Sequence, residues 1–238
     1  MLKPLLLSAV CWLGFAPTNA VGADKAPREV RIAVIGDSTV CDYPAESNIC
    51  GWGQFLAPAF QPHVRIINTA RSGRSTKTFF AEGLFGKTLA QRPEFVLIQF
   101  GHNDSHAKDK PESTDAATDF RGFLRRYVDE TRAAGAVPVF VTPMHRRRFD
   151  DAGKVTQELL PYADAMKAVA TEKKVALIDL HAASGELFNK LGDAGSADLS
   201  CSATDRTHFS EKGAKAMAGL VLKGMAEVAP ELKALLKK

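Results

Sequence analysis

Apolar and polar positions alternate along this chain in blocks that predict a parallel α/β fold. Five short runs, rich in β-branched residues and almost continuously apolar, are typical of strands buried on both faces. They are VRIAVI (30–35), VRIIN (64–68), FVLIQF (95–100), VPVFVT (137–142) and VALIDL (175–180).

Segments with helical periodicity lie between and after these strands. Serines open three of them and a glycine closes one, as expected at helix ends. The predicted helical segments are 75–91, 113–135, 161–174 and 210–228. Strands that alternate with amphipathic helices indicate a parallel sheet covered by helices on both faces.

Residues that could take part in catalysis or binding follow the predicted strands. In a parallel sheet the segments after the strands gather at the carboxyl edge, where open α/β folds bind ligands. That edge receives Gly-Asp-Ser at 36–38, ARSGRS with Gly73, GHND with Asn103, PMHRRR at 143–148, and a loop after Leu180. Ser38 is therefore either a turn residue or a nucleophile, and the rest of the chain must distinguish the two.

The segment DRTH near the C-terminus supplies the partners that a serine nucleophile needs. A serine hydroxyl requires a base, and the base requires a third group that holds its tautomer. Asp205 precedes His208 by three residues, so its carboxylate can hold Nδ1 while Nε2 faces outward. The backbone N–H groups of Ser38 and Gly73 and the side-chain amide of Asn103 can donate to an oxyanion.

Taken together, these motifs resemble the SGNH, or GDSL-type, hydrolases. The likeness rests on GDST at 36–39, Gly73, GHND at 101–104 and DRTH at 205–208, in the order of that family. The resemblance implies a flavodoxin-like, three-layer α/β/α sandwich around a five-stranded parallel sheet. It further implies that no cofactor or metal is needed. The implied roles are nucleophile for Ser38, base for His208, orienting acid for Asp205, and oxyanion hole for Ser38, Gly73 and Asn103.

A narrower resemblance points to a substrate. With GWGQ at 51–54 and TPMHRRRFD at 142–150, the motifs are similar to those of rhamnogalacturonan acetylesterases, carbohydrate esterase family 12. This implies a serine esterase that removes acetyl groups from a pectic polysaccharide. The alternatives are a xylan acetylesterase, a lipase or thioesterase of the SGNH group, and a carbohydrate-binding protein without catalysis. The arginine-rich edge favours a polar substrate over a lipid.

Several further residues are candidates for substrate contact: His102, His145, Arg146, Arg147 and Trp52. We expect at least one arginine at 146–148 to contact a uronate carboxylate, because a guanidinium fork fits a carboxylate. His102 lies within the motif of Asn103 and is expected to shape the pocket wall. Trp52 is expected either to stack on a sugar ring or to fill part of the hydrophobic core.

Composition and charge set the broad class. The chain has 238 residues, 45% hydrophobic and 24% charged, which suits one catalytic domain. A formal net charge of +4 is mild, and neither a basic patch with interleaved aromatics nor a zinc or helix-turn-helix signature occurs. We expect no nucleic-acid partner, no membrane partner and a monomer acting on an acetylated polysaccharide.

The N-terminus is typical of a secretory signal peptide. Lys3 precedes an apolar stretch that ends at Phe15, and small residues follow at Thr18 and Ala20. We predict a signal peptide over 1–23, cleaved after Ala20 or Ala23, and a hydrolase domain over 24–238. The mature protein is then secreted or periplasmic.

An exported protein meets an oxidising environment, and three cysteines lie beyond the signal segment. Cys41 and Cys50 flank the loop after Ser38, and Cys201 lies shortly before Asp205. Our hypothesis is a disulfide between Cys41 and Cys50.

Overall fold

The computed structural model describes residues 27–237, so the predicted signal peptide lies outside the described residues. Five parallel strands form one sheet in the order β2-β1-β3-β4-β5. Their bounds are β1 Val30–Ile35, β2 Val64–Asn68, β3 Phe95–Ile98, β4 Val137–Val141 and β5 Ala176–Ile178. The predicted strands are confirmed, and the order is that of flavodoxin-like folds.

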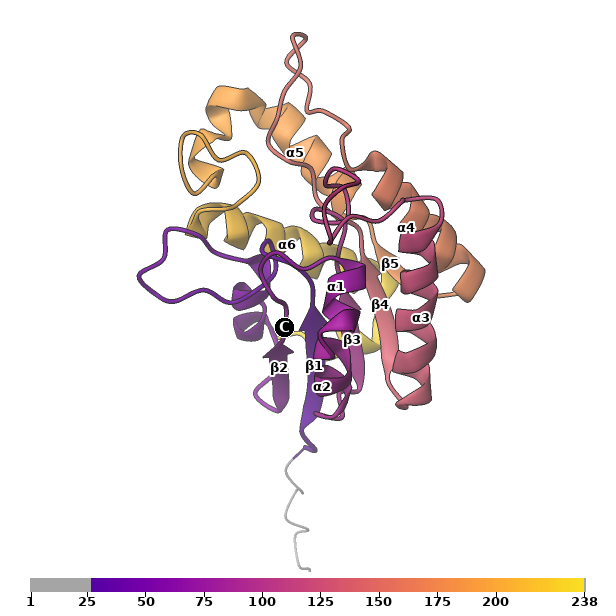
Figure 1. Cartoon of the computed structure of the whole chain (residues 1–238). Coiled ribbons are helices and arrows are strands. Elements are labelled where there is room, and N and C mark those ends of the chain that lie inside the picture. The colour runs from indigo at the N-terminus through magenta and orange to yellow at the C-terminus, as the bar shows by residue number, and fades with distance from the viewer. Residues whose placement is uncertain (1–26, 238) are drawn as a thin grey trace, which may run out of the picture.

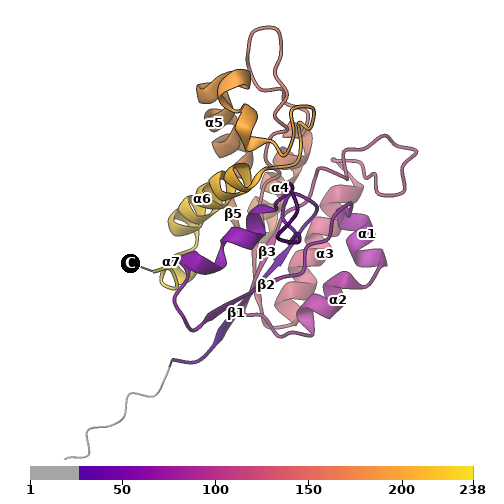
Figure 2. The ribbon, with the colours of Figure 1, turned by 90° about the vertical axis from the view of Figure 1, so that its left-hand side faces the viewer.

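Helices cover both faces of this sheet (Figures 1 and 2). The α-helices are α1 Thr76–Ala81, α2 Leu84–Leu89, α3 Asp119–Ala133, α4 Leu160–Lys173, α5 Leu180–Gly195, α6 Glu211–Val228 and α7 Pro230–Lys233. The short 3₁₀ helices are η1 Trp52–Phe55, η2 Ala57–Ala59 and η3 Ala197–Leu199. Figure 2 shows α1, α2 and α3 on one side of the sheet and α5, α6 and α7 on the other.

Two helix predictions and one loop prediction need correction. The segment 75–91 is two helices, because Gly83 adopts a left-handed conformation (φ +67°) between them. The helix predicted from 113 starts at Asp119, because Thr114 Oγ1 hydrogen-bonds to the buried Asp104. The predicted loop after Leu180 is helix α5, because the Asp179 carboxylate accepts the Ala182 N–H and caps a helix there.

Alternation along the strands divides the core into two layers. In β1, Ile32 and Val34 pack into the cluster that contains Met217 of α6. Ala33 and Ile35 pack into the opposite cluster with Tyr127 of α3. Successive strand side chains point to opposite faces, so a continuous apolar run is what a sheet with two covered faces requires.

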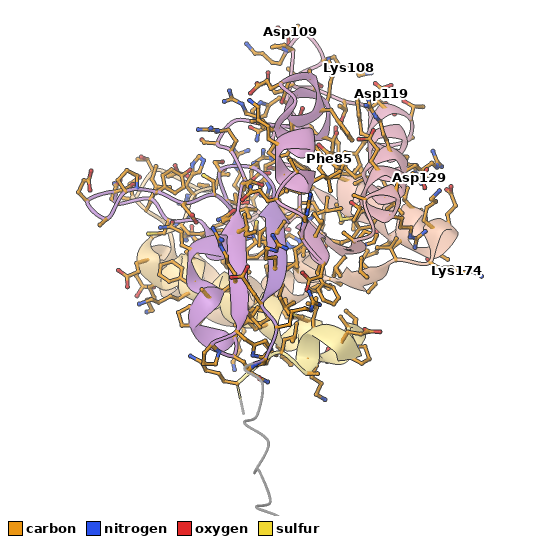
Figure 3. All side chains as sticks on the ribbon, turned by 90° about the horizontal axis from the view of Figure 1, so that it is seen from below. Phe85, Lys108, Asp109, Asp119, Asp129 and Lys174 are labelled. Carbon is orange, nitrogen blue, oxygen red and sulfur yellow. The ribbon has the colours of Figure 1, made fainter. Side chains whose placement is uncertain are left out.

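The strands all point toward one end of the molecule, where the connecting loops gather (Figure 1). The segments after β1, β3 and β4 meet there with the segment that precedes α6. Acidic and basic side chains such as Asp129 and Lys174 lie around the periphery (Figure 3). No helix within residues 27–237 is long and apolar enough to span a membrane.

The predicted disulfide is wrong, because the structure has Cys41, Cys50 and Cys201 as free thiols. The Cys41 thiol is buried and lies 3.9 Å from the carbonyl oxygen of Ser38. The strand-like segment of Cys50 pairs instead with Phe209, and Glu211 and Lys215 are the charges that act on its thiol. The two thiols therefore face different surroundings.

Candidate active site

The turn after β1 holds Ser38 in a fixed position. A Cβ at Gly36 would lie 2.7 Å from the carbonyl oxygen of Gln99, so this turn requires glycine. Asp37 Oδ1 accepts hydrogen bonds from the backbone N–H of Thr39 at 2.9 Å and from its hydroxyl at 2.7 Å. Tyr43 donates its hydroxyl to the Ser38 carbonyl at 3.0 Å. The peptide bond that follows Ser38 is thus held at both its carbonyl and its N–H.

The structure brings Ser38, His208 and Asp205 into one hydrogen-bonded row. Nε2 of His208 lies 2.9 Å from Oγ of Ser38, and Nδ1 lies 2.9 Å from Oδ2 of Asp205. Burial by itself raises the pKa of Asp205. The N–H groups of His208 and Thr207 and the imidazole outweigh that effect and lower the pKa to about 2. Asp205 is therefore ionised at neutral pH and holds the imidazole with its proton on Nδ1.

Backbone pairing between three short segments positions His208 beside Ser38. The Cys201 N–H donates to the His208 carbonyl at 3.1 Å, and the Cys50 N–H donates to the Phe209 carbonyl at 2.9 Å. Phe209 thus pairs with segments on both of its sides. Helix α6 lies against these paired segments at Gly213, where a Cβ would approach the Leu199 carbonyl oxygen to 2.0 Å.

The predicted oxyanion donors come from loops that are tied to one another. The Arg71 N–H donates to the Gly36 carbonyl at 2.9 Å, which joins the loop of Gly73 to the turn of Ser38. Asn103 donates one amide hydrogen to the Arg74 carbonyl at 2.9 Å. The second hydrogen of the amide remains for another acceptor. Within residues 27–237, the N–H groups of Ser38 and Gly73 donate to no protein acceptor.

Asp104 fixes the loop that carries Asn103. Its carboxylate accepts hydrogen bonds from Thr76 at the start of α1 and from Thr114. Burial raises the pKa of Asp104 to about 7. Asp104 is not among the predicted site residues, although it directly follows Asn103 in the GHND motif.

His102 lies under the site rather than at its surface. Its side chain is buried, and Nδ1 is 3.5 Å from Oδ2 of Asp37. Burial lowers the pKa of His102, although the Asp37 carboxylate opposes this, so the imidazole is neutral at pH 7. The structure therefore places His102 and Asp37 as a buried pair behind Ser38.

The arginines after β4 divide into two kinds. Arg147 is buried and donates to the Ser200 hydroxyl and the Asp193 carbonyl, so its fork is already occupied by the protein. Arg146 and Arg148 instead share Glu158 at a cavity. The structure thus places Arg147, predicted to contact substrate, in a supporting position.

Two other candidates are also buried in the fold. The rings of His145 and His181 stack with centroids 3.7 Å apart, and His145 Nδ1 bonds to the His181 carbonyl. Trp52 is fully buried and donates its indole N–H to Gln99 at 2.9 Å. Of the two alternatives predicted for Trp52, it therefore fills the core and does not stack on a sugar ring. Gln99 is not among the predicted site residues. The feature that could have identified it is its place as the one polar residue in the apolar run 95–100.

Comparison with known families shows to which family this chain belongs. The profile of the GDSL-like Lipase/Acylhydrolase family matches residues 34–216. The chain belongs to this family. The match spans Ser38 and His208 alike, and the predicted resemblance is confirmed.

Individual relatives give closer matches for this GDSL-family chain. It is 39% identical over 222 residues to rhamnogalacturonan acetylesterase RhgT of Bacillus subtilis, with 87% of this chain and 94% of that protein covered. It is 38% identical over 204 residues to probable rhamnogalacturonan acetylesterase YesY of Bacillus subtilis, with 83% and 93% covered. The protein is thus a carboxylic ester hydrolase, an acetylesterase.

A solved structure shows the same architecture. The crystal structure of YxiM from Bacillus subtilis superposes with a TM-score of 0.75 at 28% identity. The match covers 86% of this chain and 58% of that longer chain. The predicted α/β fold of the family is confirmed.

Proposed function

We propose that this protein is an exported acetylesterase that removes acetyl groups from a pectic polysaccharide, rhamnogalacturonan. The observation that carries the chemistry is the row in which His208 lies 2.9 Å from both Ser38 and Asp205. This geometry is what base-assisted attack by a serine requires.

In the proposed first half-reaction, Ser38 Oγ attacks the acetyl carbonyl while Nε2 of His208 takes its proton. The Ser38–carbon bond forms as the carbonyl oxygen becomes an oxyanion. The N–H groups of Ser38 and Gly73 and the amide of Asn103 stabilise that charge. His208 then protonates the sugar oxygen, the ester bond breaks, and acetyl-Ser38 remains.

In the second half-reaction, His208 takes a proton from water and the hydroxide attacks the acetyl group on Ser38. The oxyanion forms again at the same donors. Its collapse breaks the bond to Ser38, which recovers its proton from His208. Acetic acid leaves and loses its proton to the solvent as acetate forms, and the enzyme returns to its starting state.

Two observations support the polysaccharide as substrate. Relatives of 39% and 38% identity are named for rhamnogalacturonan, and the match covers most of each chain. Charged and polar side chains, among them Arg148 and Arg206, line the cavity beside His208, and such a surface suits a sugar polymer better than a lipid. The signal-like N-terminus supports export, since the polymer lies outside the cell.

Acetate release from acetylated rhamnogalacturonan and acetylated xylan, measured in parallel, tests this proposal. We expect faster release from the pectic polymer, and a loss on the order of 10⁴-fold or more in Ser38→Ala. Faster release from xylan would reassign the substrate. Cleavage of small acetyl esters alone would remove the polysaccharide assignment, and full activity of Ser38→Ala would remove the mechanism.

A further inference from the structure

Two arginines and a glutamate line a cavity beside the catalytic row. Arg146 Nη1 lies 3.4 Å from Glu158 Oε2, and Arg148 Nη1 lies 3.1 Å from Glu158 Oε1. The cavity has a volume of about 480 Å³. Its walls are Ser105, His106, Arg146, Arg148, Glu158 and Thr207.

This cavity adjoins the catalytic surface. Arg148 and Thr207 also line a second cavity of about 390 Å³, whose wall includes Asp205 and His208. The two cavities therefore meet at Arg148 and Thr207. A sugar chain that fills the cavity of His208 can extend past Arg148 into the neighbouring one.

The charge of the arginine-lined cavity is unbalanced. One carboxylate, that of Glu158, serves two guanidinium groups. Burial, and then the neighbouring Arg148, lower the pKa of Arg146, although Glu158 and Asp37 oppose the effect. These two carboxylates therefore do not replace all the hydration that Arg146 has lost, and a further anion is favoured here.

The two arginines are suited to bind that anion together. Arg146 is 12% exposed and anchored by donation from Nη2 to the His102 carbonyl at 3.0 Å. Arg148 is 53% exposed, and within residues 27–237 its side-chain hydrogen bonds all leave from Nη1. Nε and Nη2 of Arg148 are thus open to a carboxylate, which an arginine binds through two parallel hydrogen bonds.

We propose that Arg146 and Arg148 form a subsite for the carboxylate of a uronic acid residue near the acetylated sugar. Glu158 is its internal counter-ion, and the sugar carboxylate competes with it. The inference rests on the proposed polysaccharide function and deepens it: the enzyme selects acidic over neutral acetylated polymers. Residue Glu158 lowers the affinity of the subsite, and Arg148 raises it.

Inhibition of 4-nitrophenyl acetate hydrolysis tests the subsite without a polymer substrate. The inhibitors are oligogalacturonate and a neutral galactose oligomer of equal length, and the variants are Arg148→Gln and Glu158→Gln. Arg126→Gln and Glu130→Gln are matched controls, because they disrupt an exposed ion pair on α3.

We expect Arg148→Gln to raise the inhibition constant of the acidic oligomer by about 10-fold or more, because the substitution removes a guanidinium that donates two parallel hydrogen bonds to the carboxylate. Glu158→Gln lowers that constant, and the α3 variants leave it unchanged. Equal inhibition of the wild type by both oligomers would overturn the proposal. If both cavity variants changed the inhibition constant in the same direction, the proposal would also be overturned, because a general disturbance of the cavity would have the same effect in each.

Acetate release from the acetylated polymers separates the two proposals. Selective inhibition by the acidic oligomer, with no acetate released from rhamnogalacturonan, would support the carboxylate subsite and contradict rhamnogalacturonan as the substrate. Acetate release from rhamnogalacturonan, with equal inhibition by the two oligomers, would support the proposed function and contradict the subsite.

Discussion

Asp205 holds His208 through both of its carboxylate oxygens: Oδ1 accepts the His208 backbone N–H at 2.8 Å, and Oδ2 lies 2.9 Å from Nδ1 of the ring. One oxygen thus sets the backbone and the other sets the tautomer. Because Asn keeps an acceptor oxygen for the backbone, Asp205→Asn separates these roles. The amide would donate to Nδ1 and move the ring proton to Nε2, where it blocks uptake of the Ser38 proton.

We expect Asp205→Asn to lower kcat on 4-nitrophenyl acetate by about 10⁴-fold, as such a tautomer change does in serine hydrolases. Circular dichroism should show an unchanged fold, because the bonds from the Thr207 and His208 N–H groups to Oδ1 remain available. A kcat within about tenfold of wild type would contradict the orienting role.

Asn103 provides a test of the oxyanion hole. Its amide is anchored on the Arg74 carbonyl, so the second amide hydrogen keeps a fixed direction. We expect Asn103→Ala to lower kcat by about 10²–10³-fold with a small change in KM, because the donor acts in the transition state. Asn48→Ala removes an exposed amide that bonds to Cys201 and serves as the control. Similar kinetics in both variants would argue against an oxyanion role.

Two helical glycines have opposite environments. A Cβ added at Gly122 of α3 would point into open space, whereas a Cβ at Gly213 of α6 would meet the Leu199 carbonyl oxygen at 2.0 Å. Gly122→Ala should raise the free energy of unfolding by about 0.5–1 kcal/mol through helix propensity. Gly213→Ala should lower it by about 1–3 kcal/mol through overpacking. Urea unfolding measures both.

The same pair should differ in activity. Gly213→Ala displaces α6 from the segment that pairs with His208 and Phe209, so kcat should fall along with stability. Gly122→Ala should keep full activity. Equal stability of the two variants would contradict the packing at Leu199.

His181 predicts a pH dependence of stability. Burial, then repulsion from His145, lowers its pKa to about 4 from an ordinary 6.5. Between pH 6.5 and 4 the unfolded chain binds the proton and the folded chain does not, so the free energy of unfolding falls as the pH falls. The loss at pH 4 should be about 2–3 kcal/mol for this group.

Urea unfolding between about pH 7 and 4.5 checks this dependence. His181→Asn removes the titrating ring and should flatten the slope of the free energy of unfolding against pH. The His181 effect is refuted if His181→Asn retains the wild-type slope.

Local sequence determined the strands and the chemical motifs. A run such as VRIAVI is apolar on both faces, and a parallel sheet covered twice is the arrangement that buries both. GDST and DRTH contain their chemistry within four residues each, so their residue types and spacing could be recognised without the fold. The predicted class of protein was therefore accessible from the sequence.

Tertiary structure decided which side chains face the site. The sequence places Trp52, His145 and Arg147 in segments that follow strands at the carboxyl edge. Each side chain nevertheless points inward, because it bonds to a partner distant in the chain: Gln99, His181 and Asp193, respectively. Cys41 and Cys50 are close in sequence but point to different surroundings. Glu158 joins Arg146 and Arg148 across a loop. Sequence spacing fixes the order of residues along the chain, whereas the direction of a side chain depends on packing between distant segments.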